Sequence, residues 1–453
     1  DRDDPDRSCE GMKNLIDTIK NIWRIEELRN RILITLGLLL VYRIGSFIVL
    51  PGVDSARLAA SGASGGGGIV EILSIFTGGA FTRASIFALG IMPYISASII
   101  MQLAGIAVPT VQKMQREESG RRKINQWTRY LTILICVFQA PSYIYATIDE
   151  AARPDGQFWL FTSIVILTSS TLFVMWLGER ITERGLGNGI SLIIMIGILA
   201  QFPQAFAQEV VGRMGPGGGG LVLLLVEVVL WVLIIAGCIL LVQGTRRIPV
   251  QFAKRVQGNK QYGGVRNYIP LKVNAAGVMP IIFAQAIVLI PMYLAQAFET
   301  PPNWLLSISN SQGFFYNFML FLMVVAFTYF YTAITVNPNQ LADDMKRNGG
   351  FIPGVKPGKS TAGHIDELLS RITLPGAIFL GLVAILPAFA GMMGIKQGFA
   401  QFFGGTSLLI MVGVLLDTLQ QIESHLLMRH YDGLMKSGRI KGRSSGAAYG
   451  MAG

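Results

Sequence analysis

The stretch GGGGIVEILSIFTGGAFTRASIFALGIMPYISASIIMQL, residues 65–103, decides what kind of fold this chain has. Its first apolar residues recur at i, i+3, i+4 and i+7, which predicts a short helix with one apolar face: Ile69, Ile72, Leu73 and Phe76. Eight helical residues span only about 12 Å, far less than the ~30 Å hydrocarbon core of a bilayer. A full-length apolar run, interrupted by Pro93, follows. The short helix is either a mobile stopper beside a membrane span or a surface-lying or re-entrant piece with no moving part.

The composition places the chain among polytopic membrane proteins. Of its 453 residues, 51% are hydrophobic and only 14% are charged, and the mean hydropathy is +0.50. Long apolar runs in such a background predict membrane-spanning helices, because transmembrane strands are shorter and alternate apolar with polar residues. The runs predict ten spans, at residues 32–50, 86–108, 128–144, 158–177, 190–206, 221–242, 273–298, 314–336, 372–392 and 408–427.

Lysine and arginine positions predict how the chain is oriented. Arg43 and Arg83 lie at the edge of or inside apolar runs and are set aside. Of the 38 basic residues, 32 fall in the N-terminal tail, in or at the edge of the even-numbered loops, and in the C-terminal region. The odd-numbered loops hold only four: Arg57, Arg153, Arg213 and Lys396. Since cytoplasmic loops carry the excess of basic residues in membrane proteins, we expect both termini and the basic loops in the cytoplasm.

A glycine-rich segment divides the spans into two equal sets. Residues 207–220, which include GRMGPGGGG, separate spans one to five (12–206) from spans six to ten (221–428). An odd number of spans per set gives the two sets opposite topology. We expect an all-α polytopic fold of two inverted five-helix halves, joined by either a hinge or a plain flexible connector. The acidic residues 1–11 are expected to be an artefactual extension before Met12, and residues 429–453 a cytoplasmic tail.

Two cytoplasmic loops are long and basic. They cover residues 246–272 and 337–371, and both mix tyrosine, proline and glycine with their lysines and arginines. Such turn-forming residues indicate folded, protruding loops rather than solvated runs of charge. Basic loops at a membrane orient the protein and meet anionic lipid. These two could also bind nucleic acid or a cytosolic protein, and the residues alone leave these partners open.

Ionisable residues inside the spans are few. Arg43, Glu227 and Asp417 lie in spans one, six and ten and form no cluster, so each should reach the interface or find a polar partner. Transporters place such groups at the bilayer midplane, which weakens the alternative of a secondary transporter for a small solute. The sequence shows no catalytic or metal-binding spacing, and residues 353–361, PGVKPGKST, lack the first glycine of a phosphate-binding loop. We expect neither an enzyme nor a cofactor.

Two pairs of isoleucines have helical spacing. Ile91 and Ile95 flank Pro93, and Ile190 and Ile194 open span five, so each pair shares one helix face. Most such pairs face lipid or a neighbouring helix. If several converged on a central axis, they would form a dry constriction that excludes ions by dewetting.

A family resemblance runs from about Met12 to the C-terminal region. The blocks that carry it are YRIGSFIVLPGVD, most of the block quoted above (from IVEILSIF onward), ESGRRKINQWTRY, MWLGERITERGLGNGISLIIM, LKVNAAGVMPIIFA, FIPGVKPGKSTAGHI and FGGTSLLI. With them the chain resembles the SecY/Sec61 family, the central subunits of protein-conducting channels, and most closely its bacterial branch. The resemblance implies a clamshell with an hourglass pore. Such a pore passes unfolded secretory polypeptides and releases apolar segments sideways into lipid.

The resemblance also implies site residues. By motif, the pore ring falls on six isoleucines: Ile91, Ile95, Ile190, Ile194, Ile282 and Ile410. The plug falls within residues 65–79, on Ile69, Glu71, Ile72, Leu73 and Phe76. A lateral gate between spans two and seven carries the polar residues Gln102 and Asn274, which we expect to bridge its closed seam.

Finally, the resemblance implies partners and a location. The docking residues of the two basic loops are Arg246, Arg247, Lys254, Arg255, Lys356 and Lys359. Lys356 stands where the family usually has arginine, which keeps the charge but loses a planar bidentate donor. The implied partners are SecE-type and SecG-type small membrane subunits, the SecA motor ATPase, the ribosome, polypeptides bearing signal sequences, and membrane lipid. The implied location is the bacterial inner membrane.

Overall fold

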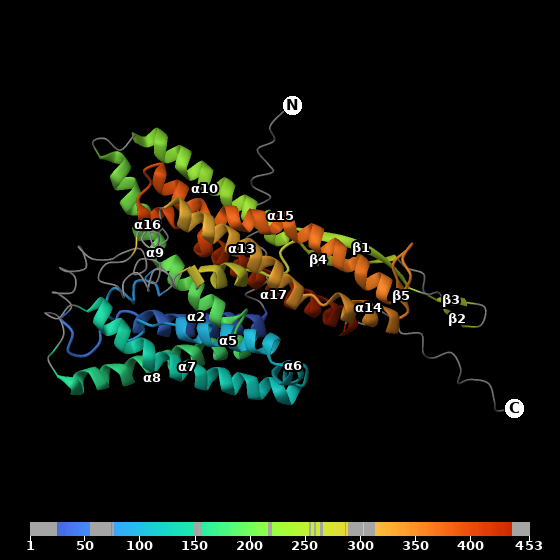
Figure 1. Cartoon of the computed structure of the whole chain (residues 1–453), viewed down its shortest axis with the longest axis horizontal. Coiled ribbons are helices and arrows are strands. Elements are labelled where there is room, and N and C mark those ends of the chain that lie inside the picture. Colours follow the sequence, from blue (N-terminus) through green and yellow to red (C-terminus); the bar gives the residue numbers. More distant parts are fainter. Residues whose placement is uncertain are drawn as a thin grey trace.

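A computed structural model describes residues 25–54, 74, 77–148, 154, 156–215, 220–252, 255–257, 260–262, 266–285, 287–288, 302 and 313–436. Helices dominate this part of the chain, and short strands occur between them. The helices form two groups that lie side by side, with one long helix between them (Figure 1).

The first group contains helices from the N-terminal half. Its bounds are α2 (Glu26–Gly45), α5 (Met92–Ala107), α6 (Pro109–Arg116), α7 (Glu118–Thr147) and α8 (Gln157–Arg184). The long helix α9 (Gly189–Met214) follows and lies between the groups (Figure 1). Asn188 starts it as an N-cap, because its side chain accepts hydrogen bonds from the backbone N–H groups of Ile190 at 3.1 Å and Ser191 at 3.5 Å.

The second group contains helices from the C-terminal half. Its bounds are α10 (Gly220–Gln243), α13 (Phe314–Thr335), α14 (Pro338–Arg347), α15 (Lys359–Met392), α16 (Gln397–Ala400) and α17 (Gly405–Lys436). Residues 279–285, within the seventh predicted span, are also helical. Six helical stretches of the described chain are long and apolar enough to cross a membrane: Phe158–Arg184, Gly189–Met214, Gly220–Gln243, Phe314–Arg347, Lys359–Met392 and Gly405–Leu426.

Several predicted boundaries are wrong, and two of them matter for the site. The span predicted at 86–108 becomes a helix only at Met92, with Pro93 in its first turn, where the missing N–H costs no intrahelical hydrogen bond. The span predicted at 190–206 continues as α9 to Met214, so the proposed connector at 207–220 starts at least eight residues too early. Pro203 lies inside α9 without ending it, as proline often does in membrane helices.

The two basic loops meet in a three-stranded sheet, and the first loop also forms a separate two-stranded one, so the described parts of both loops are folded. Strand β1 (Thr245–Phe252) pairs antiparallel with β4 (Arg266–Lys272), with Ile248 opposite Ile269. The two-residue strand β5 (Gly350–Phe351) from the second loop pairs with the other edge of β1, and β2 (Arg255–Gln257) pairs with β3 (Lys260–Tyr262). The strands lie together at one end of the molecule (Figure 1). The sheet adds a β element to the all-α fold that we predicted.

One apolar cluster joins the two halves. Buried side chains of α2, α5, α8 and α9 lie in the same contiguous cluster as those of α15, α16 and α17. Representative members are Leu39, Leu177 and Ile198 from the first half and Ala390 and Phe399 from the second. The interface between the halves is therefore closed by apolar packing.

Candidate functional site: an apolar constriction between the two halves

The start of α5 positions the first predicted pair of the pore ring. Ile91 is the N-cap residue of α5, and its carbonyl accepts the backbone N–H of Ile95 at 3.1 Å. The pair is therefore locked at i, i+4 on one face, although Ile91 itself precedes the helix. Both side chains are buried, with exposed fractions of 5% and 9%.

The start of α9 positions the second pair. The Asn188 cap fixes the first turn, and Ile190 and Ile194 lie one turn apart on α9. Ile194 is buried, whereas Ile190 is half-buried and leans on α8, where a Cβ added to Gly178 would lie 3.0 Å from Ile190 Cγ1. The glycine on α8 thus makes room for this isoleucine.

The C-terminal half supplies the remaining two isoleucines. Ile410 is buried in α17, and Ile282 lies half-buried in the helical residues 279–285. All six predicted ring residues lie in or against the single cluster that joins the halves: Ile91, Ile95, Ile190, Ile194, Ile282 and Ile410. The structure therefore brings together residues that are more than 300 positions apart in the chain. A cluster of aliphatic side chains offers no partner to an ion or to ordered water.

Aromatic side chains close the same cluster on the side away from the sheet. Phe202 of α9 stacks on Trp231 of α10, with ring centroids 5.2 Å apart, and contacts Phe402 edge-on at 5.3 Å. The Trp231 indole N–H donates to the carbonyl of Phe402 at 2.8 Å. Rings from both halves thus pack together, and one directed hydrogen bond within the C-terminal half fixes the Trp231 ring.

The predicted plug residues lie outside the described residues: Ile69, Glu71, Ile72, Leu73 and Phe76. Ser74, which is described, is buried, and its carbonyl accepts the Gln201 side-chain amide of α9 at 2.7 Å and the backbone N–H of Gly79 at 2.7 Å. Gly79 has a φ of +81°, which favours glycine. The chain is therefore anchored to α9 at Ser74, a position within the predicted plug segment.

At the predicted lateral gate, the structure gives Gln102 a different partner. The Tyr331 hydroxyl of α13 donates to Gln102 Oε1 at 3.1 Å, and Gln102 Nε2 donates to Ser98 at 3.3 Å. Asn274 is buried at 9% exposed, and its Oδ1 has no hydrogen-bond partner in the described part of the chain. One seam is therefore bridged between α5 and α13. The partner of Gln102 across this seam is Tyr331, whose side chain is longer than that of the predicted Asn274.

The predicted docking residues lie at the sheet end of the molecule. Arg246 and Arg247 are exposed on β1, and Lys356 and Lys359 are exposed near the start of α15. The loop that holds Lys356 is fixed by Thr361, whose hydroxyl donates to the Lys356 carbonyl at 2.9 Å. Lys254 lies outside the described residues, and so does the side chain of Arg255.

A buried ionic cluster was missed at the sequence level. Arg213, near the end of α9, pairs with Glu209 one turn back, Nε to Oε1 at 2.8 Å, and with Glu227 of α10. These contacts are ion pairs that lack hydrogen-bond geometry. Glu209 Oε2 also accepts the backbone N–H of Lys396 at 2.9 Å. Glu227 thus has the polar partner that we expected. The cluster was missed because span five was predicted to end at residue 206, before Glu209 and Arg213.

Comparison with known proteins agrees with this architecture. The SecY family model matches residues 85–419. The protein translocase subunit SecY of Thermus thermophilus is 43% identical over 445 residues, covering 94% of this chain and all of that protein.

Solved channel structures share the fold. One is a SecY protein whose plug domain stabilises the closed state of its translocation channel (TM-score 0.53, 17% identity, 87% of this chain and 92% of that one). Another is Sec61 in the canine ribosome–channel complex (TM-score 0.52, 16% identity, the same coverage). With a family match over most of its length and this fold, the chain belongs to the SecY family.

Proposed function

We propose that this chain is the central pore-forming subunit of a protein-conducting channel, which passes unfolded polypeptides across a membrane and releases apolar segments sideways into lipid. One observation carries the proposal: six isoleucines, contributed by both halves, lie in or against one apolar cluster. Family membership supports it, since the relatives of this chain are translocase subunits. Parting of the two halves would open the constriction along the line between them.

The chemistry of the constriction suits a polypeptide of any sequence. Isoleucine side chains can move aside by rotamer changes, and they form no hydrogen bonds that would hold a passing segment. A hydrated ion gains no ligand there and must shed water to enter. The proposed plug, at residues 65–79, would close the pore on the side where Ser74 is tied to Gln201.

The lateral exit follows the seam between the halves. The Tyr331–Gln102 bond joins α13 to α5 across it, and polar contacts between membrane helices contribute only about 0.6 kcal/mol on average. The closed seam is thus held by weak interactions. Sorting would follow transfer energies, because a leucine favours the membrane centre by about 0.5 kcal/mol whereas a central lysine costs about 3 kcal/mol.

The basic end of the molecule is the proposed docking surface. Arg246, Arg247, Lys356 and Lys359 are exposed there, so a polyanion such as ribosomal RNA or an acidic surface of the SecA motor would find several cations together. SecE-type and SecG-type subunits are further proposed partners. We infer from the excess of basic residues that this end and both termini face the cytoplasm. The bacterial relatives support the bacterial inner membrane as the proposed location.

Crosslinking to a stalled substrate tests the function. The chain is reconstituted with its small subunits in vesicles, and a precursor joined to a folded domain is stalled in the channel by the SecA motor. A cysteine at Ile194 should form a disulfide with a cysteine in the stalled segment, only when the motor and ATP are present. A cysteine at Leu199, which is 43% exposed on the same helix, serves as control. Equal crosslinking at both positions, or uptake of small solutes without precursor transport, would contradict the proposal.

A further inference from the structure

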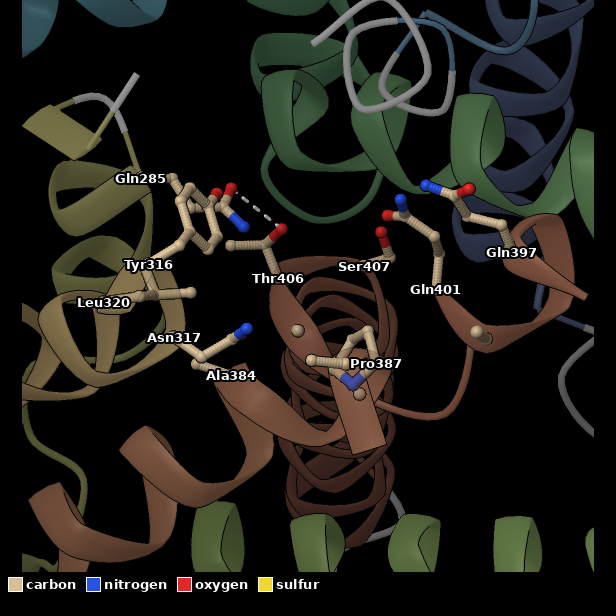
Figure 2. Close-up of a pocket in the computed structure, with 14 residues that line it drawn as sticks. Gln285, Tyr316, Asn317, Leu320, Ala384, Pro387, Gln397, Gln401, Thr406 and Ser407 are labelled. Carbon is tan, nitrogen blue, oxygen red and sulfur yellow. Dashed lines mark hydrogen bonds between the residues drawn. The ribbon is translucent and has the colours of Figure 1, made fainter. Parts of the chain in front are cut away.

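A polar pocket lies in the C-terminal half, among α13, α15, α16, the start of α17 and the helical residues 279–285. It encloses about 620 Å³, its open mouth included. The described polar side chains that line it are amides and hydroxyls: Gln285, Tyr316, Asn317, Gln397, Gln401, Thr406 and Ser407. Figure 2 shows them around the start of α17. Among the described residues that line the pocket there is no lysine, arginine, aspartate or glutamate, so the chemistry they offer is neutral hydrogen bonding.

The pocket adjoins the isoleucine constriction. Thr406 and Ser407 precede Ile410 by four and three residues on α17, and Gln285 follows Ile282 by three residues. Residues three and four apart share one helix face and lie about 5 Å apart along the axis. The two segments run in opposite directions, so these polar residues lie one turn from the ring on the same side, away from the sheet.

Several of these groups have unused hydrogen-bonding capacity. Thr406 Oγ1 donates to Gln285 Oε1 at 3.1 Å, which leaves the Gln285 amide N–H groups available. Within the described residues, no hydrogen bond engages the Ser407 hydroxyl or the side-chain amides of Gln397 and Gln401. Thr406 and Ser407 are only 3% and 4% exposed. Polar groups in such a position cost free energy unless a partner satisfies them.

We propose that this pocket binds the main chain of an extended polypeptide as it leaves the isoleucine ring. The inference rests on the proposed channel function and adds a binding site to it. Inside the ring, the N–H and C=O groups of a passing segment have no partner, which is unfavourable in an apolar environment. The pocket offers hydrogen-bond partners one helical turn beyond the ring.

The chemistry of the pocket favours a peptide group over other ligands. A primary amide carries both a donor and an acceptor, as a peptide unit does, so glutamine can pair with a main chain of any sequence. A site for a phosphate headgroup or another anion would be expected to carry lysine or arginine, and neither is among the described lining residues. Neutral amides also avoid selecting substrates by charge.

The first test is the sliding of a stalled precursor. After the motor is removed, a partly transported chain slides back, and the pocket should slow it. Gln285→Leu and Gln401→Leu remove hydrogen bonding at nearly constant size, so the sliding rate should rise about fivefold for each ordinary hydrogen bond lost. Gln340→Leu, the same change at an exposed position of α14, should leave the rate unchanged. Ser407→Ala provides a smaller change that tests the same site should the leucine variants fold poorly.

A second arm separates main-chain from side-chain binding. A precursor whose stalled segment is a run of prolines has no N–H groups to donate. It should slide faster in the unchanged channel, because its bonds to glutamine oxygens are lost, while its C=O groups still accept from the glutamine N–H groups. The glutamine substitutions should then have a smaller effect. Sliding rates that do not depend on the glutamines, or a proline run that slides no faster than an ordinary segment in the unchanged channel, would overturn the inference. In either case, the Ile194→Cys variant would still report, by forming a disulfide with the precursor, whether the precursor occupies the channel. The two proposals therefore fail separately.

Discussion

At the scale of single residues, the ring makes a direct prediction. Ile91→Ser together with Ile194→Ser places two hydroxyl groups where the closed protein has buried aliphatic side chains. Burying one such side chain is worth about 1.5–3 kcal/mol, so the barrier to hydration should fall by a comparable amount for each change. Ion flux through vesicles should rise roughly tenfold or more per substitution, as measured by release of a potassium gradient.

A matched change on the lipid face serves as the control for this experiment. Ile100 lies on α5 with Ile95 but is 47% exposed, so Ile100→Ser should not alter the leak. If the double variant holds the gradient as well as the Ile100 variant does, the isoleucines do not form the seal.

The sequence was more informative about the ring than about the pocket beside it. Helical spacing alone paired Ile91 with Ile95 and Ile190 with Ile194, but it could not join them to Ile410, because convergence depends on tertiary packing. The family resemblance supplied that link. Gln285 and Gln401 follow no motif, since a single amide in an apolar run carries no periodic signal. Only the fold brings them to one cavity.

At the scale of elements, the ionic cluster fixes the end of α9 against α10. Arg213 lies between two carboxylates, with side chains 10% exposed for Arg213, 1% for Glu209 and 4% for Glu227. Arg213→Gln would leave both carboxylates buried without a cation, at a cost of about 3–5 kcal/mol. Thermal unfolding of the purified channel in detergent should show this loss.

A more exposed pair provides the comparison. Arg129 of α7 pairs with Glu179 of α8, Nη2 to Oε2 at 2.7 Å, with Arg129 49% exposed. Arg129→Gln should cost no more than about 1 kcal/mol, because solvent screens the pair. Equal melting temperatures for the two variants would show that the buried cluster does not hold α9 to α10.

The ends of the helices were harder to predict from the sequence than their presence. Apolar runs located α8, α10 and α13 well, since length and hydropathy suffice for a membrane helix. The end of α9 was misplaced because the glycine-rich connector was predicted to start at residue 207, whereas the helix continues to Met214 and buries Glu209 against Arg213. The β1–β5 pairing joins segments about 100 residues apart, and no local pattern announces it.

At the scale of the whole molecule, the two halves meet along a long apolar interface with few directed bonds across it. Gln102 and Tyr331 form one of them, between α5 and α13. Apolar packing has no preferred register that would resist a small rotation, whereas a hydrogen bond has a defined length and direction. The closed arrangement is therefore specified by a few polar contacts and stabilised by many apolar ones.

Because a few polar contacts specify the closed arrangement, the loss of one of them should make the lateral gate easier to open. Tyr331→Phe removes the hydroxyl that bridges α5 and α13 and keeps the ring, so the closed seam should weaken by about 0.6 kcal/mol. A segment reaches lipid only through an opened seam, so the hydrophobicity needed for release should fall by about one leucine, which is worth ~0.5 kcal/mol. Test segments of graded leucine content, scored for membrane insertion against full transport, measure this threshold. Tyr329→Phe, on the same helix but bonded within its own half to Ser370, should leave the threshold unchanged, and a shift of equal size in both variants would show that the bridge does not hold the gate.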